Sequence, residues 1–136
     1  MSDPKELSCA YAAGILDGEG TITLTKESTW RYPSVSVTST TRELIDFLVD
    51  TFGGTVCTQK RYKDHHLPAW SWRIVRDASI EMLVHVRPYM REPEKLRRAN
   101  LILDCYKSVT PRNGKYTLEG VMKKRAFEVS FFKGSR

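Results

Sequence analysis

The sequence has few cysteines and no long apolar run, and each shortage excludes a class of protein. Cys9, Cys57 and Cys105 are scattered and form no CxxC pair, so they indicate neither a disulfide framework nor a zinc site. The longest purely apolar stretches are a few residues, far below the roughly 18 that a membrane-spanning helix needs. The first residues, MSDPKELS, lack the apolar segment of a secretory signal. We therefore expect a cytoplasmic protein that is not secreted.

A positive charge balance is the main feature of an otherwise ordinary globular composition. The 136 residues include 22 Lys and Arg against 16 Asp and Glu, which gives a formal net charge of +6. The charge favours a polyanionic partner such as nucleic acid, although many basic proteins bind none. The length suits one domain, and no linker or low-complexity tract divides it. We expect a single domain over 1–136, with a core over about 4–109 and a C-terminal helical extension over about 115–132.

Hydrophobic periodicity predicts helices that alternate with pairs of strands. Asp3 as cap and Pro4 as first helical residue predict a first helix that ends at Gly20. Alternating polarity predicts two strand pairs, 21–27 with 34–40 around a turn over 28–33, and about 55–62 with 69–75. A helical period predicts four more helices, over about 41–52, 78–89, 93–109 and 118–131. The fold class is therefore α+β, with a four-stranded antiparallel sheet, helices on one face and a largely polar other face.

The first predicted helix carries a stripe of small residues and two acidic residues at its end. Ala10, Gly14 and Gly18 recur every four residues, so a second helix of the same chain or of another can approach closely. Asp17 and Glu19 lie where the helix dipole disfavours negative charge. Such carboxylates are candidate ligands for Mg²⁺, which proteins hold through carboxylate and phosphate oxygens. Solvated acids at a helix end are the alternative.

Residues 12–20, AAGILDGEG, resemble the motif of the LAGLIDADG homing endonucleases. They differ from it at Ala12, in the Ile-Leu order and in Gly-Glu for Ala-Asp, but the acidic residue is kept. The predicted order of helices and strand pairs is the family's α-ββ-α-ββ-α core, over roughly 5–109, and PYMREPEKLRRANLIL resembles its closing helix. The resemblance implies a site-specific, metal-dependent DNA endonuclease whose sheet forms a saddle facing DNA. For a reading frame in an organellar intron, the expected location is the organelle interior.

The resemblance also implies roles for individual residues. Glu19 would be the essential metal-binding acid, with the backbone carbonyl of Gly18 in the metal shell, and Asp17 would be structural. Lys95 would lie near the scissile phosphate, with an exposed lysine as the alternative. Ser39 falls where the family often has Gln or Asn to position water, and serine departs from that pattern. The expected metal is Mg²⁺, with Mn²⁺ as a substitute and Ca²⁺ as an ion that occupies the site without supporting cleavage.

A single copy of the motif supplies a single catalytic carboxylate, whereas cutting both strands of a duplex needs two. The single-motif members of the family are homodimers, which implies a twofold dimer that pairs the stripe Ala10, Gly14 and Gly18 and carries a formal +12 (twice +6). The partner is double-stranded DNA with a long and nearly palindromic target. No small-molecule substrate and no membrane partner are expected.

The polar face of the sheet is the predicted DNA-contacting surface, because a two-stranded ribbon fits the major groove. In the first hairpin its outward residues are Thr21, Thr23, Thr25, Glu27, Ser34, Ser36 and Thr38. If Val56 points into the core, those of the second hairpin are Cys57, Gln59, Arg61, Ser71 and Arg73. With the opposite parity, Thr58 and Lys60 point outward instead. Trp30 and Arg31, in the first turn, would lie over phosphates.

The residue types on this face match the base edges of the major groove. Arg61 and Arg73 are candidates for guanine, Gln59 for adenine, and Glu27 for accepting a hydrogen bond from cytosine. A solvated sheet face that binds nothing is the alternative for the Thr and Ser rows.

Two other functions compete with the endonuclease. The first is a catalytically silent DNA- or RNA-binding member of the same fold, such as an intron maturase or a DNA-binding regulator. Retention of Glu19 with Lys95 favours the enzyme, since a binder needs neither, while Ala12 and Ser39 leave the binder open. The second is an unrelated basic α+β protein whose motif match is accidental.

Overall fold

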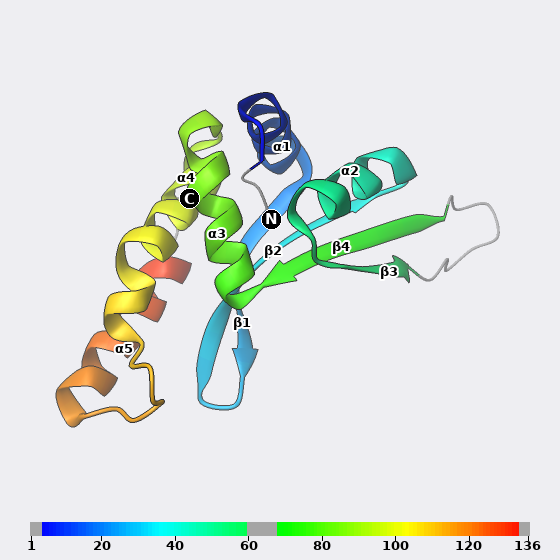
Figure 1. Ribbon diagram of the computed structural model, residues 1–136. Coiled ribbons are helices and arrows are strands. Elements are labelled where there is room, and N and C mark those ends of the chain that lie inside the picture. Colours follow the sequence, from blue (N-terminus) through cyan, green and yellow to red (C-terminus); the bar gives the residue numbers. More distant parts are fainter. Residues whose placement is uncertain (1–3, 60–67, 134–136) are drawn as a thin grey trace.

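The computed structural model describes residues 4–59 and 68–133 (Figure 1). Its regular elements are α1 (Glu6–Glu19), β1 (Gly20–Glu27), β2 (Trp30–Ser39), α2 (Arg42–Phe52), β3 (Thr55–Gln59), β4 (Ala69–Val75), α3 (Arg76–Val86), α4 (Pro93–Leu101) and α5 (Leu118–Phe132). A 3₁₀ turn, Arg87–Tyr89, follows α3, and a π turn, Ile102–Tyr106, with a 3₁₀ turn, Lys107–Val109, follows α4. This order confirms the predicted α+β class.

The four strands form one antiparallel sheet in the order β1-β2-β4-β3. The described helices lie on one face of it, and its other face carries none of them (Figure 1). Ile22, Val35, Val37, Trp72 and Ile74 point toward the helices and are buried there. Because partners across an antiparallel pair share a face, this core set fixes which residues of each strand point away from the helices.

The first hairpin is tighter than predicted. Its turn consists of Ser28 and Thr29 alone, so the predicted turn over 28–33 is wrong and β2 starts at Trp30. Pro33 had favoured a turn, since proline cannot donate to a sheet ladder. In the structure Pro33 pairs with Leu24 of β1. The pairing of β2 with β4 begins only at Ser34, so Pro33 has a neighbouring strand on one side alone.

Helix α1 starts later than predicted. Its N-cap is Lys5, which has an extended backbone, and Pro4 precedes the helix. The predicted cap, Asp3, lies outside the described residues. The helix predicted over 93–109 also differs, because it changes from α to π and then to 3₁₀ geometry. For β3, the predicted residues 60–62 lie outside the described part of the chain. Helix ends commonly shift by one or two residues, because local hydrogen bonds compete there.

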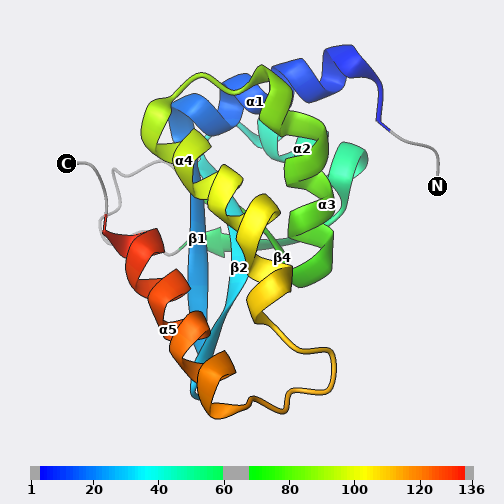
Figure 2. The same cartoon turned by 90° about the vertical axis from the view of Figure 1, so that its left-hand side faces the viewer.

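Helix α5 packs beside α4 and the first hairpin (Figure 2). Phe127 and Phe131 are buried in the core. Arg97 of α4 donates to the carbonyl oxygens of Ser130 and Phe131 at 3.1 and 2.8 Å, which satisfies acceptors that the end of a helix leaves unpaired. The buried Lys124 donates to Thr110 Oγ1 at 2.5 Å, and its burial lowers its pKa.

None of the described helices is long and apolar enough to cross a membrane.

Glycine is required where α2 turns into β3. Gly54 has a φ of +96°, and a Cβ there would lie 2.7 Å from the carbonyl oxygen of Arg73 and 2.7 Å from Trp72 Nε1. The same indole nitrogen donates to the carbonyl oxygen of Gly53 at 2.7 Å, so Trp72 cannot move away without losing that bond. Gly114 also has a positive φ, of +70°, but a Cβ there would meet nothing within 4 Å.

We expect Gly54→Ala to lower the free energy of unfolding by roughly 2–4 kcal/mol, from left-handed strain and overpacking together. Gly114→Ala, which adds only the strain, should cost about 1 kcal/mol. Urea unfolding at one fixed protein concentration measures both. Equal losses in the two variants would contradict the close approach at Gly54.

Candidate functional site

Glu19 lies at the junction of α1 and the sheet. It is the last residue of α1, it is exposed, and its carboxylate makes no hydrogen bond or ion pair with the residues that the structure describes. Gly20 follows with extended backbone, and a Cβ there would lie 2.7 Å from Leu16 Cα. Glycine therefore lets the chain pass directly from helix to strand, which holds Glu19 at the corner between them.

The other acidic residue of the motif, Asp17, is fully engaged within the chain. Its two carboxylate oxygens accept hydrogen bonds from the backbone N–H groups of Arg91, at 3.0 Å, and Glu92, at 3.1 Å. These bonds fasten the end of α1 to the segment before α4. Of the two candidate metal ligands, only the carboxylate of Glu19 is left available.

Lys95 binds the end of α1 from the first turn of α4. Its Nζ donates to the carbonyl oxygens of Leu16, at 2.9 Å, and Asp17, at 3.0 Å. This is the cation that offsets the negative end of the helix dipole beside Glu19. Two of its three N–H groups are used, and the third remains for another acceptor. The alternative of an exposed, solvated lysine is wrong, because Lys95 is half-buried.

The donor set at this corner fits part of the shell of a divalent cation. Nowhere in the described ranges do three His, Cys, Asp or Glu side chains gather as a metal site. One chain offers the Glu19 carboxylate and the carbonyl of Gly18, which are hard oxygen donors of the kind that Mg²⁺ and Ca²⁺ prefer. The rest of the shell must come from water, phosphate or a second chain.

Ser39 makes no hydrogen bond with Glu19 or Lys95 in the part of the chain that the structure describes. It ends β2, and its hydroxyl accepts a hydrogen bond from the backbone N–H of Thr41 at 3.0 Å. It lies two residues beyond Val37 on β2, so both side chains are on the helix-covered side of the sheet. Its role in positioning water stays a prediction.

The small-residue stripe of α1 faces away from the rest of the described chain. A Cβ at Gly14 or Gly18 would meet nothing within 4 Å, so no other described helix packs against these glycines. With Ala10, Tyr11 and Leu44 they line a shallow hollow of about 430 Å³. The alternative of a close contact inside the chain is therefore wrong for the described residues.

Strand pairing places the predicted DNA-contacting residues on the open face of the sheet, away from the helices. In the first hairpin these are Thr21, Thr23, Thr25, Glu27, Ser34, Ser36 and Thr38. Ser34 is nevertheless buried, at 3% exposed, with its hydroxyl 2.7 Å from that of Thr25, so its prediction as a DNA contact is not supported. In the second hairpin Val56 pairs with the buried Trp72, so Cys57 and Ser71 share the open face and Thr58 does not. Arg73 lies there as well, opposite Ser36. The backbone of Gln59 pairs with Ala69, whereas its side chain, Lys60 and Arg61 lie outside the described part.

The two residues of the first turn that were predicted to lie over phosphates, Trp30 and Arg31, both contact other parts of the chain. Arg31 is on the helix side, where its guanidinium lies 4.9 Å from the ring centre of Phe132 and its backbone N–H donates to Glu128 at 3.1 Å. The prediction that Arg31 lies over phosphates is not supported, because Arg31 belongs to β2, shares the helix side with Val35, and is covered by α5. Trp30 packs against Tyr116, with ring centres 5.0 Å apart.

The open face also carries residues that the sequence pattern did not predict. Tyr32 lies there because it is two residues before Ser34 on β2 and so shares its face. Thr55 lies there because it pairs with Arg73. Arg76, just after β4, places its guanidinium 4.1 Å from the ring centre of Tyr32. The alternation of Trp30, Tyr32 and Ser34 was the signal, and the proline that follows Tyr32 masked it.

Several arginines near Lys95 are held by carboxylates of the same chain. Arg97 and Arg98 both pair with Glu94, and the hydrogen bonds from Arg97 are the main cause that lowers the pKa of Glu94 to about 2. Arg87 pairs with Asp104 at 3.0 Å. These arginines are structural first, since each already has an anionic partner.

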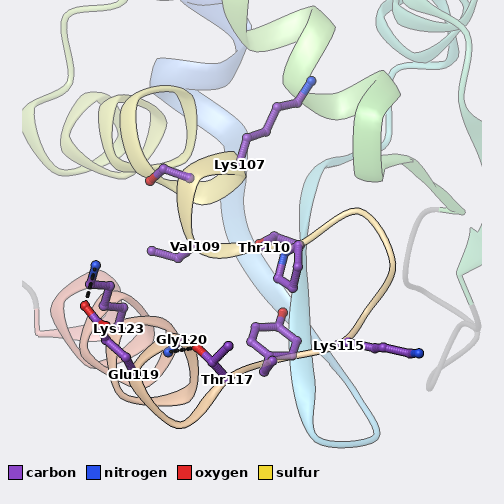
Figure 3. Close-up of a pocket in the computed structure, with 11 residues that line it drawn as sticks. Lys107, Val109, Thr110, Lys115, Thr117, Glu119, Gly120 and Lys123 are labelled. Atoms are coloured by element: carbon purple, nitrogen blue, oxygen red, sulfur yellow. Dashed lines mark hydrogen bonds and ion pairs between the residues drawn. The ribbon is translucent and has the colours of Figure 1, made fainter.

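A separate hollow of about 420 Å³ lies between the turn after α4 and the start of α5 (Figure 3). Its lining includes Lys107, Lys115 and Lys123, and Lys123 is paired with Glu119 at 3.1 Å. None of its lining residues is among the predicted site residues, so it is not part of the corner at Glu19.

The fold of the chain is similar to that of solved DNA endonucleases. The homing endonuclease I-CvuI, in complex with its target in the presence of calcium, is 20% identical, with a TM-score of 0.69 over 93% of this chain and 80% of that chain. A second I-CvuI complex, in magnesium and with its DNA not cleaved, is 19% identical, with a TM-score of 0.66 over 96% of this chain and 86% of that chain.

Two further structures differ in how much of their length is matched. The archaeal intron-encoded homing endonuclease I-Vdi141I, complexed with DNA, is 12% identical, with a TM-score of 0.64 over 96% of this chain and 86% of that chain. The LAGLIDADG homing endonuclease I-SmaMI, bound to cleaved DNA, is 24% identical, with a TM-score of 0.61 over 99% of this chain and 47% of that chain. No protein-family model and no curated protein matches the sequence.

The pKa of Glu94 leads to an acid-stability prediction. Because its folded pKa is about 2 and its ordinary value is 4.5, the unfolded chain binds more protons between these pH values, and stability is lost as the pH falls through this window. We expect wild type to be more stable than Glu94→Gln above about pH 4.5 and the difference to shrink toward pH 2. Urea unfolding from pH 2 to 6 measures this.

Glu119→Gln, which removes an exposed carboxylate, is the control and should follow wild type. A constant difference between wild type and Glu94→Gln across the window would contradict the role of the Arg97 contact.

Proposed function

Because the chain has the fold of the LAGLIDADG homing endonucleases, we propose that it is a site-specific DNA endonuclease that acts as a homodimer with a divalent metal. The observation that carries the proposal is the corner at the end of α1. There, the unpaired carboxylate of Glu19 follows the helix end to which the Lys95 ammonium group is hydrogen-bonded. The corner lies at the end of a sheet whose open face is polar. The motif residues 12–20 supply the helix, the acid and the turn together.

The residues at this corner would have different roles in phosphodiester hydrolysis. Glu19, with the carbonyl of Gly18, would hold Mg²⁺, whose chemistry is to activate water and to stabilise the leaving oxygen. Mn²⁺ is the expected substitute, and Ca²⁺ is expected to bind without supporting cleavage. The remaining N–H of Lys95 points to a role in stabilising the charge that develops on the phosphate. Asp17 keeps the two helices in register and does not enter the reaction.

The proposed homodimer pairs α1 with its twofold copy. In this arrangement the stripe of Ala10, Gly14 and Gly18 lets the two helix backbones approach, and the two Glu19 carboxylates come to the axis. The match to 86% of I-Vdi141I but 47% of I-SmaMI is what we expect if the active unit needs two copies of the fold, in two chains or in one.

The proposed substrate is double-stranded DNA with a long, nearly palindromic target. The rise along a strand, about 3.3 Å per residue, is close to the base-pair step of about 3.4 Å, so outward side chains can follow successive base edges. The open-face row of Thr21 to Glu27, together with Ser36 and Thr38, would supply these contacts in each half-site, whereas Ser34 is buried. The formal +12 of the dimer (twice +6) would draw the phosphate backbone to it.

A catalytically silent DNA-binding protein of the same fold is the second candidate. Ser39 favours it, because its hydroxyl accepts from the backbone N–H of Thr41 and forms no hydrogen bond with Glu19 among the described residues. A DNA-binding protein without activity would use the open face of the sheet and would need neither Glu19 nor Lys95.

The Glu19→Gln variant separates these functions. We expect wild type to cut both strands of a selected duplex in Mg²⁺, and Glu19→Gln to lose at least about 10²-fold in cleavage rate while it still binds in Ca²⁺. Gel assays of cleavage and binding measure this, with Glu119→Gln as a control that should cut like wild type. Binding by wild type without cleavage in Mg²⁺ or Mn²⁺ would favour the silent binder.

The Gly14→Leu variant tests the dimer. We expect wild type to sediment as a dimer and Gly14→Leu as a folded monomer, because the new side chain fills the space needed by the second helix, while its Cβ meets nothing within 4 Å in its own chain. Ala126→Leu, at an exposed position of α5, should remain dimeric. Sedimentation equilibrium and far-ultraviolet circular dichroism measure assembly and folding, and a monomeric wild type would contradict the symmetric dimer.

A further inference from the structure

Two cations of α4 bind the backbone on the two sides of Glu19. Lys95 binds the carbonyl oxygens at the end of α1, before Glu19. Arg98 Nη1 donates to the carbonyl oxygen of Ile22, in β1 and three residues after Glu19, at 2.9 Å. Lys95 and Arg98 are three positions apart, so they lie on the same face of the helix. One face of α4 therefore holds the chain both before and after the candidate metal ligand.

The corner at Glu19 lies where two hydrogen-bond ladders end. Glu19 is the last residue of α1, and Gly20 is the first residue of β1. β1 is an edge strand that pairs with β2 alone, so no strand holds its outer side. The ends of helices and strands are the parts that open most readily. The direction of the unpaired Glu19 carboxylate therefore depends on contacts that fix the backbone on each side of it.

The side chain of Arg98 is itself held in place. Its Nε donates to Glu94 at 3.2 Å, and its guanidinium lies 4.9 Å from the ring centre of the buried Phe131. Only 25% of the side chain is exposed. A planar guanidinium that is already held by a carboxylate and a ring loses little further freedom when it donates to Ile22. Arg98 is therefore a rigid link from α4 to β1.

The neighbouring Arg97 shares the ion pair of Arg98 but not this link. It forms two hydrogen bonds with the same Glu94, at 2.8 Å each. Its other bonds go to the carbonyl oxygens of Ser130 and Phe131 in α5. Among the described residues, Arg98 is thus the one of the two that binds the strand after Glu19.

We infer that Arg98 is a positioning residue for Glu19, which holds the start of β1 so that the carboxylate points to where the metal binds. The inference rests on the proposed metal-dependent function. It makes the metal affinity of the corner depend on an arginine that is not a metal ligand. If Arg98 instead contacted a phosphate, it would strengthen DNA binding and leave the metal affinity unchanged.

Arg98→Met tests this, because methionine keeps an unbranched apolar side chain and removes every donor. We expect the Mg²⁺ concentration for half-maximal cleavage to rise by roughly 10-fold or more, the lower end of the loss seen when an outer-shell partner of a metal ligand is removed. Calorimetric titration of the protein–DNA complex with Ca²⁺ should show the same loss of metal affinity. DNA binding at saturating Ca²⁺ should keep the salt dependence of wild type.

Arg98→Lys provides a second variant for the same measurements. Lysine keeps a charged donor for the carbonyl oxygen of Ile22 but lacks the planar fork that also binds Glu94. Its metal affinity should therefore lie between those of wild type and Arg98→Met. Far-ultraviolet circular dichroism checks that each variant is folded.

Arg97→Met is the matched control, since it removes the same charge and a bond to the same Glu94. It should lose stability in urea and keep the metal affinity of wild type. Equal metal affinities in Arg98→Met and Arg97→Met would overturn the positioning role, whether both match wild type or both are weakened. A weaker salt dependence of DNA binding in Arg98→Met, with the metal affinity of wild type, would show a phosphate contact instead.

The Ca²⁺ titration decides the inference even for a wild type that does not cleave. A wild type that cleaves, with no difference between the two methionine variants, would overturn the inference and leave the proposed function in place. A wild type that binds DNA but neither cleaves it nor takes up Ca²⁺ would overturn the proposed function, and the inference with it.

Discussion

The reciprocal capping between the end of α1 and the start of α4 is the constraint on which the candidate site depends. Lys95 supplies donors to the last carbonyl oxygens of α1, and Asp17 supplies acceptors to the N–H groups just before α4. Each end thereby satisfies groups that the other leaves unpaired. The partners are more than 70 residues apart in the chain, so the bonds also close the helical layer over the sheet. Glu19 stays unpaired because Asp17 carries the structural role.

The same principle, a side chain that binds the backbone of a distant element, recurs around the molecule. Arg97 binds the end of α5, and the indole of Trp72 binds the turn after α2. The Arg97 bonds attach the C-terminal extension to the core, where α5 lies over the first hairpin. One consequence is functional, because α5 covers Arg31 and removes it from the surface that would face DNA.

The open face of the sheet is more ordered than a row of solvated hydroxyls. Thr25 bonds to Ser34 and Thr38 to Ser71, so side chains of neighbouring strands hold one another. Because its polar groups are already oriented, this face would lose less side-chain entropy on binding a partner with regularly spaced acceptors and donors. The polar rows and the buried rows alternate along the same strands, so stability on one face and recognition on the other come from a single pattern.

Sequence alone determined the type and order of the elements, because amphipathic period is a local property: Ile22 and Leu24 alternate with threonines, and the glycines after Phe52 end a helix. The motif resemblance also named Glu19, Asp17 and Lys95. Only the tertiary structure decided which strand lies beside which, that Arg98 binds the carbonyl oxygen of Ile22, and that Lys95 caps α1. Those outcomes depend on register and on contacts between distant segments, and a one-residue change in a turn reverses every side chain beyond it.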